Sequence, residues 1–180
     1  MLIANKSVGL FLICVQLFGC KSQMDIYALC RVGDVKKLSR ILDSQPQLIN
    51  TQDDEQKWTP LHYSIYSGRI DVARLLLARG ADVNLVTRGG ETPLHFAASE
   101  LNAEMVRLLL DAGADVTVKD GTPNHNTPLD NAVIAKKHVA ESRLIPPDSI
   151  KHYKQKTKEE LDAEDVQLAT VIELLKPASQ

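Results

Sequence analysis

Histidines are the residues of this chain best suited to catalysis or metal binding, because imidazole transfers protons near neutral pH and binds zinc. The chain has five of them, His62, His95, His125, His138 and His152. None lies two to four residues from another His or from a Cys, which is the usual spacing of zinc-binding pairs. No serine stands in a G-x-S-x-G turn, and no glycine-rich loop has a phosphate-binding pattern. The sequence therefore predicts no metal site, no cofactor, no small-molecule substrate and no catalytic residue. A hydrolase that uses these histidines is the competing hypothesis.

Two of the histidines belong to a repeated motif. The tetrapeptide TPLH occupies residues 59–62 and 92–95, and TPLD occupies residues 127–130, so the copies begin 33 and 35 residues apart. Behind the first two copies, leucine-rich segments lead to GADVN at residues 80–84 and GADVT at residues 113–117. This recurrence predicts that the motif histidines hydrogen-bond locally between loops and have no part in chemistry.

The repeated residues match the needs of short helices. Each motif Thr can accept hydrogen bonds from the first backbone N–H groups of a helix, and Pro suits the first helical position because it has no N–H. Gly68, Gly80 and Gly113 follow expected helices and can end them with positive φ. The leucines give the second helix of a repeat an apolar stripe, which is buried only when repeats stack.

These motifs closely resemble the ankyrin repeat. The resemblance implies an all-α solenoid of about four helix-turn-helix repeats over residues 24–176, clearest over residues 58–117. The first and last repeats are degenerate, as is usual at the ends of a solenoid. An insertion over about residues 139–156, which contains two consecutive prolines, separates the helices of the last repeat, and residues 177–180 form a tail.

The N-terminal residues resemble a bacterial lipoprotein signal peptide. Lys6 precedes an apolar run over residues 8–18, which is too short to cross a bilayer as a helix, and the run leads to Leu-Phe-Gly before Cys20. The resemblance implies removal of residues 1–19, lipidation of Cys20 and a short tether over residues 20–23. The lysine that follows favours the outer membrane, which places the protein on the periplasmic side of the envelope. An uncleaved anchor and an ordinary core helix are the competing interpretations.

Partners of ankyrin proteins generally lie against the loop tips and the first, inner helices of the repeats. Carried over by position, the resemblance implies a protein-binding surface formed by three loop-tip residues and six inner-helix residues. In chain order they are Arg31, Trp58, Tyr66, Ser67, Arg88, Glu91, Ser99, Glu100 and Ile134. Trp, Tyr and Arg dominate interface energetics. Packing of Trp58 on a neighbouring loop, and an exposed Tyr66 ring without a role, are the competing interpretations.

Charge narrows the class of partner. The net charge of −2 over 180 residues argues against a dedicated nucleic-acid binder, which carries a basic excess. Residues 136–158 are locally basic, with seven Lys or Arg against two acidic residues. This basic segment is interpreted either as a contact for an acidic protein surface or as a charged face exposed only to solvent.

A chain with both a lipoprotein-like signal peptide and ankyrin-like repeats resembles two groups of small periplasmic ankyrin proteins. One group consists of immunity proteins that neutralise phospholipase toxins delivered by the type VI secretion system. The other group is associated with catalase activity and peroxide resistance. The first resemblance implies an immunity lipoprotein that occludes a secreted phospholipase effector. A stress-protection or assembly factor for a periplasmic enzyme, and a general envelope scaffold, are the alternatives.

Overall fold

The computed structural model describes residues 26–143 and 158–176. The expected signal peptide, the lipidation site Cys20 with its tether, most of the insertion and the C-terminal tail lie outside the described residues. The sequence-based expectations for these segments therefore remain predictions.

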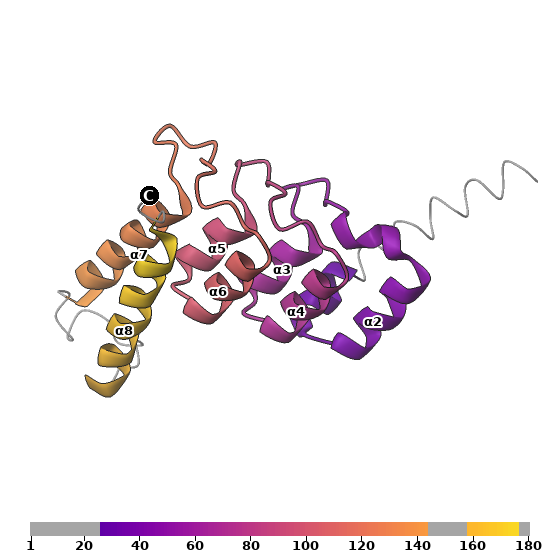
Figure 1. Ribbon diagram of the computed structural model, residues 1–180, viewed down its shortest axis with the longest axis horizontal. Coiled ribbons are helices and arrows are strands. Elements are labelled where there is room, and N and C mark those ends of the chain that lie inside the picture. Colours follow the sequence, from indigo (N-terminus) through magenta and orange to yellow (C-terminus); the bar gives the residue numbers. More distant parts are fainter. Residues whose placement is uncertain (1–25, 144–157, 177–180) are drawn as a thin grey trace, which may run out of the picture.

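The described chain is a row of helix pairs that stack side by side (Figure 1). Residues 26–32 are helical and precede α2 (Val35–Ser44) and the short 3-10 helix η1 (Pro46–Asn50). The pairs that follow are α3 (Pro60–Tyr66) with α4 (Ile70–Ala78), α5 (Pro93–Ser99) with α6 (Ala103–Asp111), and α7 (Pro128–Arg143) with α8 (Lys158–Leu175). No strand occurs in residues 26–143 or 158–176. The all-α solenoid of about four repeats is confirmed.

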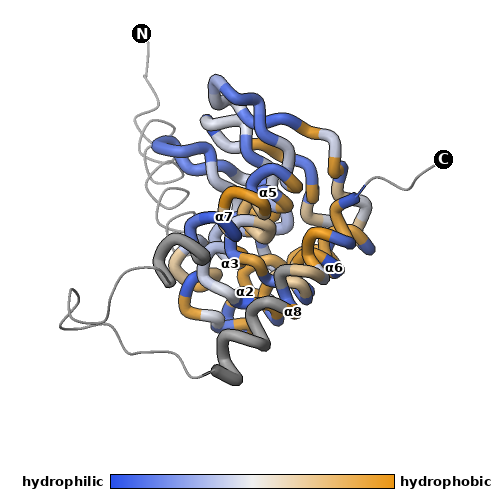
Figure 2. Tube along the Cα trace, turned by 90° about the vertical axis from the view of Figure 1, so that its left-hand side faces the viewer, coloured by the Kyte–Doolittle hydropathy of each residue, from blue (hydrophilic) through white to orange (hydrophobic). Residues whose placement is uncertain are grey.

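Stacking buries the apolar side that each helix pair leaves open. Leu61 of α3, Leu94 of α5, Leu76 of α4 and Leu109 of α6 are all fully buried. Small buried residues allow close approach of the inner helices α3, α5 and α7; they are Ser64, Ala97, Ala98 and Ala132. Figure 2 shows the hydrophobic residues gathered along the helices, whereas the loops at the top are mostly hydrophilic.

Glycines end three of the helices, as the sequence predicts. The φ angle is 64° at Gly68 after α3, 85° at Gly80 after α4 and 87° at Gly113 after α6. Each residue takes the left-handed conformation that stops a helix. Among the described helices, none is both long and apolar enough to cross a membrane.

Helix α7 is longer than the other inner helices, with 16 residues against 7 in α3 and 7 in α5. Its position equivalent to Gly68 is Lys136, which favours continuation of the helix. The helix ends at Arg143, shortly before the prolines of the insertion. The segment predicted to be an insertion from residue 139 therefore begins as a helical extension.

Candidate partner-binding site

The motif histidines tie the start of one inner helix to the loop of the next repeat. At α3, the Thr59 N–H donates to His62 Nδ1 (3.2 Å) and the His62 N–H donates to Thr59 Oγ1 (3.3 Å). This is a capping box in which His replaces the usual Glu or Gln. His62 Nε2 then donates to the carbonyl oxygen of Glu91 (3.3 Å). His95 repeats the arrangement and donates to the carbonyl oxygen of Asn126 (3.1 Å).

Both histidine rings are buried and neutral. Burial lowers the pKa of His62 to about 4 and also lowers the pKa of His95, although the carbonyl oxygen that each ring meets opposes the shift. Both ring nitrogens of His62 have partners, so the ring has a structural role. The part of the chain that the structure describes holds no group of three or more His, Cys, Asp or Glu that could bind a metal ion.

Three finger loops lie along one edge of the row of helices, at residues 51–59, 85–92 and 118–127 (Figure 1). Arg88 joins the first two. Its backbone N–H (2.8 Å) and its guanidinium Nη2 (2.9 Å) each donate to a backbone carbonyl oxygen of the first finger loop. The finger loops therefore support one another across the repeats.

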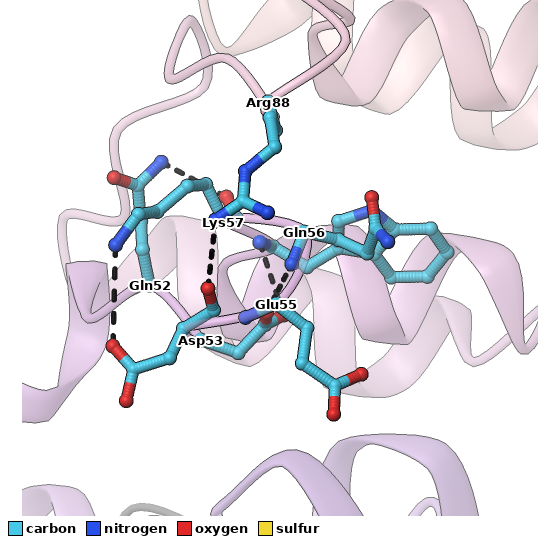
Figure 3. A network of polar contacts seen from close by, with 8 residues as sticks. Gln52, Asp53, Glu55, Gln56, Lys57 and Arg88 are labelled. Carbon is cyan, nitrogen blue, oxygen red and sulfur yellow. Dashed lines mark hydrogen bonds and ion pairs between the residues drawn. The ribbon is translucent and has the colours of Figure 1, made fainter.

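Asp53 organises the first finger loop (Figure 3). Its Oδ1 accepts from the N–H groups of Glu55 (2.9 Å) and Gln56 (2.7 Å). Its Oδ2 accepts from the Trp58 N–H (3.1 Å) and the Tyr63 hydroxyl (3.1 Å). Partial burial raises the pKa of Asp53, but these hydrogen bonds outweigh it and hold the pKa below its usual value. The carboxylate is thus committed to positioning Trp58.

The second and third finger loops meet at glycines. The Gly121 N–H donates to the Gly89 carbonyl oxygen (2.6 Å), and Gly90 has a φ of 77°. A Cβ atom on Gly90 would lie 2.5 Å from the Gly121 nitrogen. The Gly89-Gly90 pair is therefore explained by the close approach of two backbones.

One aromatic cluster contains every Phe, Tyr and Trp of the described residues: Tyr27, Trp58, Tyr63, Tyr66 and Phe96. Trp58 lies at its centre, with its ring centroid 5.2 Å from that of Tyr63, 5.2 Å from that of Tyr66 and 4.9 Å from that of Phe96. Tyr27 lies 4.9 Å from Tyr63 and extends the cluster into the first repeat. Tilted and edge-to-face rings at these separations attract one another, so the cluster is a rigid platform across three repeats.

Two of the predicted partner-binding residues, Trp58 and Tyr66, meet in this cluster. Trp58 is half-buried and packs on rings of α3 and α5, whereas 58% of the Tyr66 surface is exposed. Ser67 follows directly and is half-buried. The structure therefore presents the Tyr66 ring to solvent with Trp58 as its support.

The other inner-helix candidates continue from Tyr66 as a row. Arg31, Tyr66, Ser99 and Ile134 occupy equivalent positions of the four repeats, and all four are exposed. Glu100 lies beside Ser99 and is also exposed. This inner-helix row presents, in order, a cation, an aromatic ring, a hydroxyl group and an aliphatic side chain.

The loop-tip candidates Arg88 and Glu91 are placed differently. The Arg88 guanidinium already binds the first finger loop. Glu91 is half-buried, and its pKa is raised by burial and by the nearby Asp120 carboxylate. Arg88 thus holds two finger loops together, whereas the Glu91 carbonyl oxygen ties its own finger loop to His62 of α3. Contact of either residue with a partner remains a prediction.

Sequence reasoning misses Tyr63, Phe96 and the role of Asp53. Tyr63 and Phe96 stand four residues after the capping Thr59 and Thr92, so an aromatic ring recurs at one position of the repeat. This recurrence is the signal that could have found the cluster. Asp53 is recognisable in the sequence only as part of an acidic run.

The family of ankyrin repeats, in its three-copy form, matches residues 26–120 and 84–145 of this chain, which together span two thirds of it. The chain belongs to the ankyrin-repeat family. The expected resemblance is thereby confirmed for the repeats. Because ankyrin repeats mediate protein–protein binding, the general prediction of a protein partner is supported as well.

Several curated relatives share the repeats with this ankyrin-repeat protein. Ankyrin repeat domain-containing protein 49 of Bos taurus is 48% identical over 50 residues, which cover 28% of this chain and 21% of the relative. Scaffold protein ILK of Homo sapiens is 36% identical over 68 residues, covering 38% and 15%. The 2-5A-dependent ribonuclease of Mus musculus is 37% identical over 60 residues, covering 33% and 8%. The match spans about a fifth or less of each of these relatives.

Proposed function

We propose that this ankyrin-repeat protein binds one protein partner through the inner-helix row, with Tyr66 as the anchor and Trp58 as its support. The observation that carries the proposal is the exposure of Tyr66. It is the exposed member of the aromatic cluster, whose other rings are buried or half-buried. A ring held in place by Trp58 offers a partner a large contact area and loses little conformational freedom on binding.

We further propose that the protein is an immunity lipoprotein on the periplasmic side of the outer membrane. Its partner would be a phospholipase toxin delivered by the type VI secretion system. The lipobox-like sequence that ends at Cys20 supports the location, and the four-repeat array supports a dedicated protein-binding role. Cys20 would carry the lipid anchor.

Occlusion would neutralise such a toxin without any chemistry by this chain. A phospholipase receives acyl chains, so the mouth of its active site and its membrane-docking surface are apolar. Burial of that surface against Tyr66, Trp58 and Ile134 would be driven by the hydrophobic effect. The polar finger loops would form the rim of the interface, where water is excluded less completely. The purified protein is accordingly expected to leave esters, phosphodiesters and peptides unchanged.

The proposal is tested by affinity capture from the native host with residues 21–180 as bait, followed by mass spectrometry. One stoichiometric phospholipase is the expected result. A catalase or another resident enzyme would instead support stress protection or assembly, and many weak partners would support a scaffold. In parallel, a strain without the gene should be killed by toxin-delivering sibling cells. Full resistance of that strain would exclude the immunity function.

A further inference from the structure

The outer end of the first repeat carries an open groove of about 570 Å³ between the helix at residues 26–32 and α2. Its apolar lining residues are Ala28, Leu29, Val32 and Ile41. Val32 is 70% exposed, the highest value among the large exposed hydrophobic residues of the described chain. The terminal repeat of a solenoid normally presents a polar outer face, because no further repeat covers it. The apolar groove departs from this pattern, which makes this end of the row a candidate docking surface.

Cations from α2 stand around the groove. Lys37 and Arg40 line it, and Lys36 is exposed on the same helix. Asp34 also lines the groove, and its carboxylate lies 3.5 Å from Lys37. The Lys37 N–H and ammonium, together with the Arg40 guanidinium, lower the pKa of this carboxylate, so both lining cations act on it. Lys36, Lys37 and Arg40 still outnumber this one carboxylate. The full chain is acidic overall, with a net charge of −2, so this local excess of positive charge opposes the general trend. An anionic occupant with an apolar part matches these features.

The chain length limits where this end can lie. Six residue steps separate Cys20 from Ile26, and they span at most about 22 Å when fully extended. With lipid on Cys20, as in the proposed function on which this inference rests, Ile26 stays within that distance of the bilayer surface, and the lining of the groove begins two residues later, at Ala28. Phosphate groups and acyl chains are both available there.

We infer that the outer end of the first repeat docks on anionic phospholipid at the membrane surface. Lys37 and Arg40 contact the headgroup phosphates, and Val32 packs at the boundary with the acyl chains. The row of repeats then extends away from the bilayer. Because packed helices lie about 10 Å apart, Tyr66 is held roughly 10–20 Å above the surface, where a membrane-bound enzyme would work.

The test measures binding of residues 21–180, without lipid, to vesicles of phosphatidylethanolamine and phosphatidylglycerol in a ratio of two to one. Vesicles of pure phosphatidylcholine are the comparison. The wild-type chain should bind the anionic vesicles better. The double variant Lys37→Gln/Arg40→Gln should bind them about thirtyfold more weakly, since each cation near the surface contributes to the attraction. The control is the double variant Arg107→Gln/Lys119→Gln, which removes the same amount of positive charge at exposed sites away from the groove. It should bind the anionic vesicles like the wild type.

A second pair of variants tests the apolar contact. Val32→Ser should bind anionic vesicles severalfold more weakly, whereas Val166→Ser, at an equally exposed valine of α8, should not. Equal binding of the wild type to both kinds of vesicle would overturn the inference, and so would equal losses in the test and control variants. Capture of the protein partner does not depend on this contact. If the protein captured its partner but did not bind the vesicles, the membrane contact would be rejected and the proposed function would stand.

Discussion

Gly90 is the residue at which the second and third finger loops come closest. An alanine there would place its Cβ 2.5 Å from the Gly121 nitrogen, in a residue whose φ is 77°. We expect Gly90→Ala to lower the free energy of unfolding by roughly 3 kcal/mol, because left-handed strain and displacement of the Gly121 backbone add together. Gly80→Ala is the matched control. Its φ is 85° but nothing lies within 4 Å of the added Cβ, so the loss should be about 1 kcal/mol. Equal losses in urea unfolding would contradict the close approach.

The buried His62 should make the fold sensitive to mild acid. Its pKa is about 4 in the folded protein against an ordinary value of 6.5, so only the unfolded chain gains a proton as the pH falls through this interval. The contribution of His62 to stability should be constant above about pH 6.5 and should decrease below it, by up to about 1.4 kcal/mol per pH unit. His62→Gln retains a side chain suited to the capping box and should reduce this slope in unfolding measured at pH 7 and pH 5. His125→Gln, at an exposed site, should keep it. A wild-type slope in His62→Gln would refute the assignment.

The backbone conformation of a residue could be predicted where its type strongly favours that conformation, as glycine favours positive φ. Gly68, Gly80 and Gly113 end helices as expected. Lys57 and His125 also take positive φ, at 59° and 50°, yet neither residue type requires it. Both occupy the finger-loop position of Gly90, so only the alignment of the repeats reveals their conformation. The loop geometry overrides the local preference at these two positions.

The first finger loop depends on a single carboxylate. Asp53→Ala would leave three backbone N–H groups and the Tyr63 hydroxyl without their acceptor, so we expect a loss of about 2 kcal/mol in unfolding free energy. Loosening of this loop should also change the fluorescence of Trp58, the single Trp of the chain. Asp54→Ala is the control. The Asp54 side chain is fully exposed, and its ion pair with Lys57 is long, at 4.0 Å between Oδ1 and Nζ. If both variants unfolded at the same urea concentration, Asp53 would not organise the loop.

The end of an inner helix could be predicted from the sequence at α3, where a glycine follows, but not at α5 or α7. Helix α3 ends before Gly68, and the repeat position recurs as Leu101, which takes a φ of 52° after α5. At Lys136 the same position stays helical, and α7 continues to Arg143. The sequence predicts that an insertion begins at about residue 139, but its two consecutive prolines lie at residues 146–147, beyond the end of α7.

Across the whole molecule, periodicity made the architecture and the inner-helix row predictable. The spacing of the TPLH and TPLD motifs was enough to place Tyr66, Ser99 and Ile134 at one position of successive repeats. Arg31 is placed by the match of Gly33 to Gly68, because the first repeat lacks the motif. The aromatic cluster was not predictable in the same way, because Trp58 and Phe96 meet only when two repeats lie side by side. The partner is not encoded in the fold, since one fold supports many functions.

The measurement that tests the central claim most directly is the dissociation constant of Tyr66→Ala for the captured partner. Tyr66 is mostly exposed, so its truncation should leave the fold intact, and Val166→Ala on α8 is the control at another exposed apolar residue. An interface anchor contributes about 2 kcal/mol or more, so we expect Tyr66→Ala to bind roughly thirtyfold more weakly or worse. Val166→Ala should bind like the wild type. An unchanged dissociation constant for folded Tyr66→Ala would contradict the claim that this ankyrin-repeat protein recognises its partner through the inner-helix row.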